Sequence, residues 1–122
     1  MSAKRILVTE DDPSIRALLA TILRHANYEV DTANNGQEAV RKASQTAYDV
    51  IVLDLMMPVM SGLEVLERLA ERTPKPRFVV IMSAASHDMV SRADCANVFA
   101  VLQKPSAITE IVATVGACIA AA

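Results

Sequence analysis

Short apolar runs alternate along this chain with segments in which apolar residues recur at helical spacing. The runs have the length of strands and cover about Arg5 to Thr9, Tyr28 to Thr32, Val50 to Asp54, Phe78 to Met82 and Phe99 to Gln103. Such alternation is typical of repeated βα units around a parallel sheet. The second run is the least apolar, so we expect it at an edge of the sheet. The pattern predicts one α/β domain over residues 1–122.

The segments between the runs predict helices. The first helix carries Ile15, Leu18, Leu19, Ile22 and Leu23 on one face. Asp12 is its expected N-cap, Pro13 its first residue and Asn27 its end. The later helices are a weak one after the turn Asn34-Asn35-Gly36 to about Ala47, one through Leu63, Leu66 and Leu69, a poorly patterned one from Ser86 to about Cys95, and one through Ile108, Ile111, Val112, Val115 and Ile119.

Composition narrows the possible environments and partners. Hydrophobic residues make up 52% of the 122 residues but aromatic residues only 3%, so the core must be aliphatic. The formal net charge is −2 and the basic residues are scattered, which argues against direct binding of DNA. We expect no export signal, no membrane span and a cytoplasmic location. Cys95 and Cys118 lack metal-binding spacing and are expected to be buried free thiols.

Candidate chemistry gathers where three of the apolar runs end. The first run leads into Glu10, Asp11 and Asp12, the third ends at Asp54, and the last leads into Lys104. Ligands of open parallel sheets bind beyond the carboxyl ends of the strands, where the strand order reverses. With the strand order 2-1-3-4-5, that crevice lies between Glu10-Asp11, after the first run, and Asp54, at the end of the third. Three neighbouring carboxylates stay ionised only if a cation shares them, and Mg²⁺ prefers such oxygen ligands.

Each of these residues can be given a role. Asp11 and Asp54 would bind the metal directly, Glu10 through water, and Met56 through its backbone carbonyl. Ionised Asp54 would attack phosphorus and form an acyl phosphate, while Lys104 neutralises charge on the phosphoryl oxygens. Ser83, which follows the fourth run, could hydrogen-bond one of those oxygens. For Asp12, the role of helix cap is favoured over metal ligation.

The chain resembles the receiver domain of two-component response regulators over essentially its whole length. The resemblance is carried by the stretches Ile6 to Pro13 and Asp49 to Gly62, the pair Ser83-Ala84 and the pair Lys104-Pro105. It implies a flavodoxin-like (βα)5 fold, a cis Lys104-Pro105 peptide and Mg²⁺-dependent phosphorylation of Asp54. The donor would be a phosphohistidine on a sensor histidine kinase or a histidine phosphotransfer protein. A downstream target protein would dock on the fourth helix, last strand and last helix.

Two positions depart from the family, and two other functions remain open. Val101 stands where receivers usually carry the aromatic residue of the output switch, although Phe99 has the same strand parity. Ser106 stands where the family often has Phe. Val101 suggests an interaction module that no longer responds to phosphorylation, whereas the intact acidic set argues against it. An aspartyl phosphatase would need an acid at Met56, so we expect no enzyme beyond self-phosphorylation and self-dephosphorylation. Met56 instead suggests an apolar shield that slows loss of phosphate.

Overall fold

The computed structural model describes residues 4–54, 60, 62–69, 77–82, 98–103 and 108–121. The strands are β1 (Arg5–Thr9), β2 (Glu29–Ala33), β3 (Val50–Asp54), β4 (Arg77–Met82) and β5 (Val98–Gln103), and the helices are α1 (Pro13–His25), α2 (Gly36–Gln45), α3 (Gly62–Leu69) and α5 (Ile108–Ala120). These elements fall within one to two residues of the predicted ones. The helix predicted from Ser86 to Cys95 lies outside the described residues.

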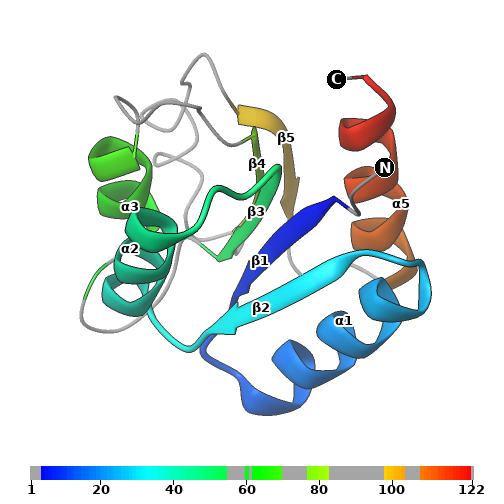
Figure 1. Cartoon of the computed structure of the whole chain (residues 1–122), viewed down its shortest axis with the longest axis horizontal. Helices are drawn as coiled ribbons and strands as arrows, with labels where there is room; N and C mark the ends of the chain where they lie inside the picture. Colours follow the sequence, from blue (N-terminus) through cyan, green and yellow to red (C-terminus); the bar gives the residue numbers. More distant parts are fainter. Residues whose placement is uncertain are drawn as a thin grey trace.

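All strand pairs are parallel, and the strands lie in the order β2-β1-β3-β4-β5 (Figure 1). The predicted order is confirmed, including the place of β2 at an edge. Two of its five residues are buried, two are partly buried and one is exposed, whereas all five residues of β3 are buried, which agrees with that place. The strand order reverses between β1 and β3, where Val8 lies opposite Val52 and Thr9 opposite Leu53.

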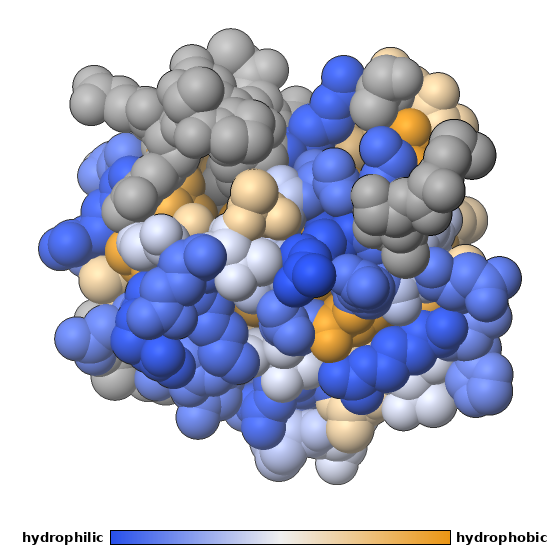
Figure 2. Space-filling view, in the orientation of Figure 1, coloured by the Kyte–Doolittle hydropathy of each residue, from blue (hydrophilic) through white to orange (hydrophobic). Residues whose placement is uncertain are grey.

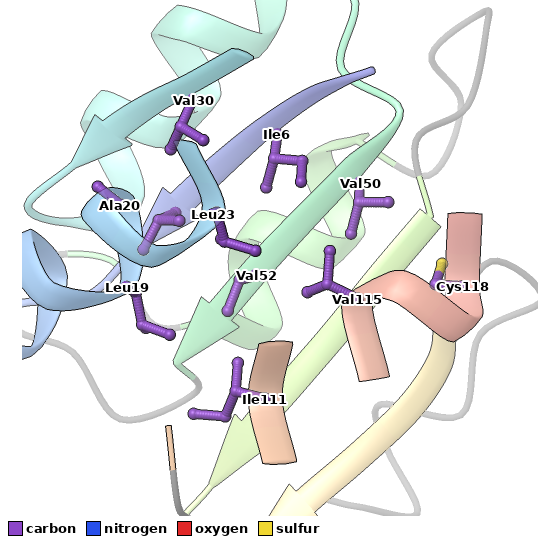
Figure 3. Packing of buried hydrophobic residues seen from close by; sticks show 11 residues of the cluster. Ile6, Leu19, Ala20, Leu23, Val30, Val50, Val52, Ile111, Val115 and Cys118 are labelled. Atoms are coloured by element: carbon purple, nitrogen blue, oxygen red, sulfur yellow. The ribbon is translucent and has the colours of Figure 1, made fainter. Parts of the chain in front are cut away.

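Helices cover both faces of the sheet, because successive side chains of a strand point to opposite sides. Ile6 and Val8 of β1 pack toward α1 and α5 in one core, which Figure 3 shows from close by. Leu7 packs toward α2 and α3 in the other core. The aliphatic character expected from the composition holds in both, with Tyr48 the one aromatic side chain among the described core residues. This doubly wound arrangement confirms the flavodoxin-like fold class.

The start and end of α1 are as predicted, but its buried stripe is narrower. The Asp12 carboxylate accepts hydrogen bonds from the amides of residues 14 and 15, and Asn27 adopts the left-handed conformation with φ of 72°. Leu19 and Leu23 are buried. Ile15 and Leu18 are 36% and 48% exposed, which corrects the prediction of one packed face. At 100° per residue the apolar stripe is wider than the part of the helix that can touch the sheet.

The start of α2 packs tightly against Met60 and against Val65 of α3. Asn35 caps this helix by accepting the amide of Glu38 at 2.8 Å, so the predicted turn at this point is also an N-cap. A Cβ added at Gly36 would lie 2.5 Å from the carbonyl oxygen of Met60 and 2.8 Å from Val65 Cγ2. Only glycine allows this approach. The helix ends at Gln45, two residues before the predicted end.

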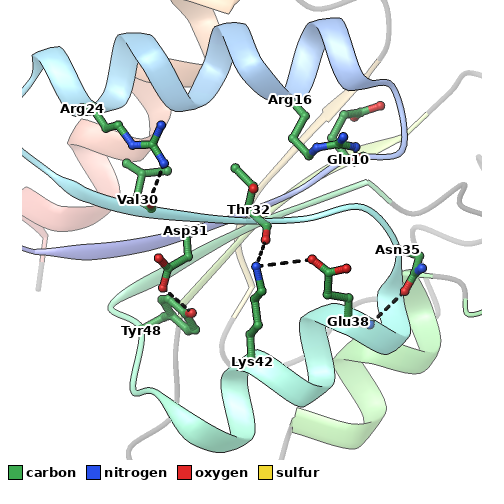
Figure 4. Close-up of polar contacts among 10 residues, drawn as sticks. All are labelled: Glu10, Arg16, Arg24, Val30, Asp31, Thr32, Asn35, Glu38, Lys42 and Tyr48. Carbon is green, nitrogen blue, oxygen red and sulfur yellow. Dashed lines mark hydrogen bonds and ion pairs between the residues drawn. The ribbon is translucent and has the colours of Figure 1, made fainter.

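Cationic side chains from both helical layers cover the outer edge of β2. Arg24 of α1 donates from Nη2 to the carbonyl of Val30 at 2.9 Å, and Lys42 of α2 donates to the carbonyl of Thr32 (Figure 4). The amide of Glu29 donates to the carbonyl of Lys4, directly before β1, so the carbonyls of the alternate residues of β2 face away from the sheet. Their occupation by side chains closes part of an edge that could otherwise pair with another strand.

The surface on the side of β2 is mainly polar. Figure 2 shows a largely hydrophilic face over α1, β2 and α2, with small hydrophobic areas between polar ones.

Cys118 is a buried free thiol, as predicted. Burial raises the pKa of this thiol, and Arg77 partly opposes the increase. Cys95 lies outside the described residues. None of the described helices is both long and apolar enough to cross a membrane.

Candidate functional site

The register of β1 and β3 brings Glu10 and Asp54 together. Val8 lies opposite Val52, so two residues further along the two strands Glu10 comes opposite Asp54. Both have the strand parity of Val8 and Val52, whose side chains pack toward α1 and α5. Asp54 is fully buried and Glu10 is 2% exposed. The predicted meeting of these two acids at the switch point of the sheet is therefore present.

Asp11 completes a cluster of three carboxylates. One oxygen each of Glu10, Asp11 and Asp54 can be chosen so that all lie within 4.8 Å of one another. Asp11 is exposed, whereas the other two are buried, so the cluster opens to water on the side of Asp11. A small hard cation that keeps several waters and takes one or two carboxylates fits this donor set. The arrangement is suited to Mg²⁺ together with an oxygen-rich ligand.

Hydrogen bonds hold the segment between β1 and α1. The amide of Glu10 donates to the carbonyl of Ala33 at 3.2 Å, extending the pairing of β1 with β2. The Glu10 carboxylate accepts the amide of Asp12 at 3.3 Å. The Asp12 carboxylate is itself occupied in capping α1, at 2.8 Å from the amide of Ser14. Asp12 therefore acts as a cap, as predicted, and is absent from the carboxylate cluster.

The other predicted site residues lie outside the described part of the chain. Met56, Ser83 and Lys104 belong to this group, so their roles stay predictions. Ser83 follows β4 and Lys104 follows β5, and both of these strands are described. They run parallel to β3, with Asp54 opposite Ile81 and Met82 opposite Gln103. Their carboxyl ends thus lie at the same edge of the sheet as Asp54.

The prediction for the output switch concerns β5. The side chain of Val101 is not among those described, although its backbone pairs with Val80. Phe99 is 39% exposed and lies where the register between β4 and β5 shifts. Such bulges are common at sheet edges and redirect side chains. Whether Phe99 replaces the missing ring of the switch stays a prediction.

Sequence reasoning missed Arg16. Its guanidinium Nη1 donates to the backbone carbonyl of Glu10 at 2.9 Å. A cation in the first turn of a helix is unfavourable with respect to the helix dipole. That misplaced charge was the signal in the sequence that could have drawn attention to Arg16.

Comparison with known proteins agrees with this fold and site. The family model of the response regulator receiver domain matches residues 6–116. The response regulator ArlR of Staphylococcus aureus is 34% identical over 90 residues, which cover 74% of this chain and 41% of that protein. The chain thus matches less than half the length of this curated relative.

Solved structures give the same result. The response regulator TrrA of Thermotoga maritima, solved in complex with Mg²⁺ and BeF, has a TM-score of 0.80 and 33% identity, covering 94% of this chain and 98% of that chain. The chemotaxis protein CheY4 of Vibrio cholerae has a TM-score of 0.79 and 26% identity, covering 96% of this chain and 99% of that chain.

A doubly wound parallel sheet with an acidic cluster at its switch point defines the class of protein. With the family match over most of its length, the chain belongs to the receiver domains of two-component response regulators. The resemblance drawn from the sequence is confirmed. The acidic cluster of Glu10, Asp11 and Asp54 corresponds to the pocket expected of such a domain, and the buried Asp54 is suitably placed for phosphorylation.

Proposed function

We propose that Asp54 accepts a phosphoryl group from a phosphohistidine, and that Glu10, Asp11 and Asp54 hold the Mg²⁺ that this step needs. The observation that carries the proposal is the convergence of three carboxylates within 4.8 Å, with Asp54 fully buried at the end of β3. Glu10 is buried as well, so Asp11 is the exposed member of this cluster. Asp11 faces the water from which the cation and phosphoryl group arrive.

In the proposed reaction an Asp54 oxygen forms a bond to phosphorus as the bond from phosphorus to the histidine nitrogen breaks. Mg²⁺, when bound, neutralises charge on the phosphoryl oxygens. Lys104 is proposed to share that task, Ser83 to hydrogen-bond one phosphoryl oxygen, and the Met56 carbonyl to complete the metal ligands. These assignments are supported by their positions in the sequence, directly or closely after β3, β4 and β5.

The proposed partners follow from the family. A response regulator interacts with a histidine kinase and with a downstream target, and we propose that the kinase or a histidine phosphotransfer protein supplies the phosphoryl group. The net charge of −2 favours a protein as the target over direct contact with DNA. We place the exchange in the cytoplasm, the usual location of the family, and the free thiol of Cys118 fits a reducing compartment.

The competing proposals receive less support. An interaction module that does not respond to phosphorylation would have no use for crowded carboxylates, because bringing them together costs free energy unless a cation is shared. An aspartyl phosphatase would require a general acid, and Met56 cannot transfer a proton. We therefore propose that the domain catalyses only the gain and loss of its own phosphoryl group, and that the phosphate shifts the balance between two conformations.

Incubation with acetyl phosphate followed by intact-mass measurement tests the proposal. The wild-type chain should gain a single phosphoryl adduct that requires Mg²⁺, and Asp54→Asn should gain none. Asp49→Asn is the matched control: Asp49 immediately precedes the opposite end of the same strand, where its carboxylate accepts the amide of Arg5 at 2.8 Å. This control should react like the wild type. A folded wild-type chain without an adduct, while a verified receiver reacts, would favour the interaction module.

A further inference from the structure

Arg16 links the first turn of α1 to the acidic cluster. Its own amide donates to the carbonyl of Asp12 at 2.9 Å, as the first helical turn requires. Its side chain extends back along the chain, and Nη1 donates to the carbonyl of Glu10 at 2.9 Å; Figure 4 shows the guanidinium beside Glu10. The contact is partly buried, which limits competition by water. A charged donor makes this hydrogen bond stronger than one between neutral groups.

The carbonyl that Arg16 holds belongs to the peptide that joins the two adjacent acids. This unit is planar, so fixing the direction of the Glu10 carbonyl also fixes the Asp11 amide and the position of its Cα. Two other hydrogen bonds of Glu10 act elsewhere: its amide donates to the carbonyl of Ala33, and its carboxylate accepts the amide of Asp12. Among these contacts, that of Arg16 is the one that restrains the peptide between the two carboxylates.

We propose that Arg16 is a positioning residue that orients the peptide between Glu10 and Asp11, so that their carboxylates and Asp54 converge on one divalent cation. The proposal rests on the proposed function, because it concerns the metal site of that reaction. Removing a group that orients a metal ligand through a hydrogen bond typically costs about 10- to 100-fold in metal affinity. Sequence position alone, in the first turn of a helix, gives Arg16 no such role.

A positioning role and a purely electrostatic role of Arg16 predict opposite changes in Mg²⁺ affinity when the guanidinium is removed. The direction of that change therefore distinguishes the two roles. If the guanidinium acts only through its positive charge, removing it should strengthen binding of a cation at the neighbouring acids. If it holds the peptide, removing it should weaken that binding, because the carboxylates would no longer be held in place. Arg16→Met removes the charge and the donor while keeping an unbranched side chain.

The chain offers a matched control in the same helix. Arg24 also donates a guanidinium hydrogen bond to a backbone carbonyl, that of Val30, over the same 2.9 Å and the same separation of six residues. Arg24→Met therefore removes an equivalent bond and the same charge at the other end of α1. Both variants should lose stability, and Arg24→Met somewhat more, since a cation in the last turn is favourable for the helix.

Binding of Mg²⁺ to the unphosphorylated chain, followed by amide chemical shifts in NMR, is the first readout. Arg16→Met should weaken Mg²⁺ binding by about 10-fold or more, the size expected when a ligand loses its supporting partner. Arg24→Met should remain close to the wild type. Arg16→Lys, which can donate to the same carbonyl, should recover part of the affinity. If Arg16→Met does not fold, the comparison of Arg16→Lys with the wild type decides, with a weaker affinity expected for lysine.

The rate of adduct formation with acetyl phosphate provides the second readout. Arg16→Met should need more Mg²⁺ for half of its maximal rate, whereas the rate at saturating Mg²⁺ should stay near that of the wild type. A loss of stability alone would not raise the Mg²⁺ concentration needed for half of the maximal rate while leaving the rate at saturating Mg²⁺ unchanged. Equal Mg²⁺ affinity in Arg16→Met and Arg24→Met, or tighter binding in Arg16→Met, would overturn the positioning role while leaving the function of Asp54 intact. A wild-type chain that binds no Mg²⁺ would overturn both proposals.

Discussion

Replacing Thr9 with valine should make this protein more stable. Thr9 is the last residue of β1 and is 1% exposed, and its hydroxyl has no hydrogen-bond partner among the residues that the structure describes. It lies opposite Ala33 on one side and Leu53 on the other, both members of the core beneath α2 and α3. A polar group is therefore enclosed by apolar neighbours.

The size of the effect follows from that environment. A buried polar group without a partner costs about 1–3 kcal/mol. Valine has nearly the shape of threonine and the same stiff branching at Cβ, so the strand conformation is preserved. The replacement removes the desolvation cost, and a small mismatch in packing offsets part of the gain. We expect about 1–2 kcal/mol of additional stability, or an increase of Tm of about 4–8 °C for a domain of this size.

Urea unfolding followed by far-UV circular dichroism measures this change, because the chain has no tryptophan to report by fluorescence. The midpoint should rise with an unchanged slope. Val8→Thr is the reciprocal control: Val8 is fully buried in the other core, and the introduced hydroxyl should destabilise by a similar amount. An unchanged or lower midpoint for Thr9→Val would refute the reasoning, since it would mean that the hydroxyl has a partner in solution.

Two further predictions concern other core contacts. Burial, and then the 2.7 Å hydrogen bond from its hydroxyl to the Asp31 carboxylate, raise the pKa of Tyr48. The folded state therefore keeps this proton while the unfolded state loses it above about pH 10, so stability should fall as the pH rises further. Tyr48→Phe should be about 1–2 kcal/mol less stable at neutral pH and should lose less on alkaline titration; parallel curves would contradict this. Gly36→Ala should destabilise by about 1–3 kcal/mol, because its Cβ would meet the Met60 carbonyl at 2.5 Å. Gly116 lies in the interior of α5, where an added Cβ would have its nearest contact at 3.9 Å, so Gly116→Ala should instead stabilise by about 0.5–1 kcal/mol. Thermal unfolding measures both variants. Equal shifts in Tm would contradict the role given to the space around each glycine.

Local features of the sequence were enough for the fold and for the principal acids. Apolar runs and helical spacing predicted the described elements within a few residues, because these patterns depend on neighbours along the chain. Asp12 and Pro13 marked the start of α1 for the same reason. The strand ends then identified Glu10, Asp11 and Asp54, since parallel strands bring their carboxyl ends to one edge.

Contacts between distant segments could not be read from the sequence in this way. The exposure of Leu18 depends on how α1 is rotated against the sheet, and the partnerless hydroxyl of Thr9 depends on what α2 and α3 place around it. Helical spacing cannot show that the guanidinium of Arg16 reaches back to the Glu10 carbonyl, because that contact depends on the path of the chain between β1 and α1. The sequence by itself determined which elements form and where the acids stand along them. Only the tertiary structure decided the distances, because the 4.8 Å convergence of the carboxylates requires strands far apart in the chain to pair in one register.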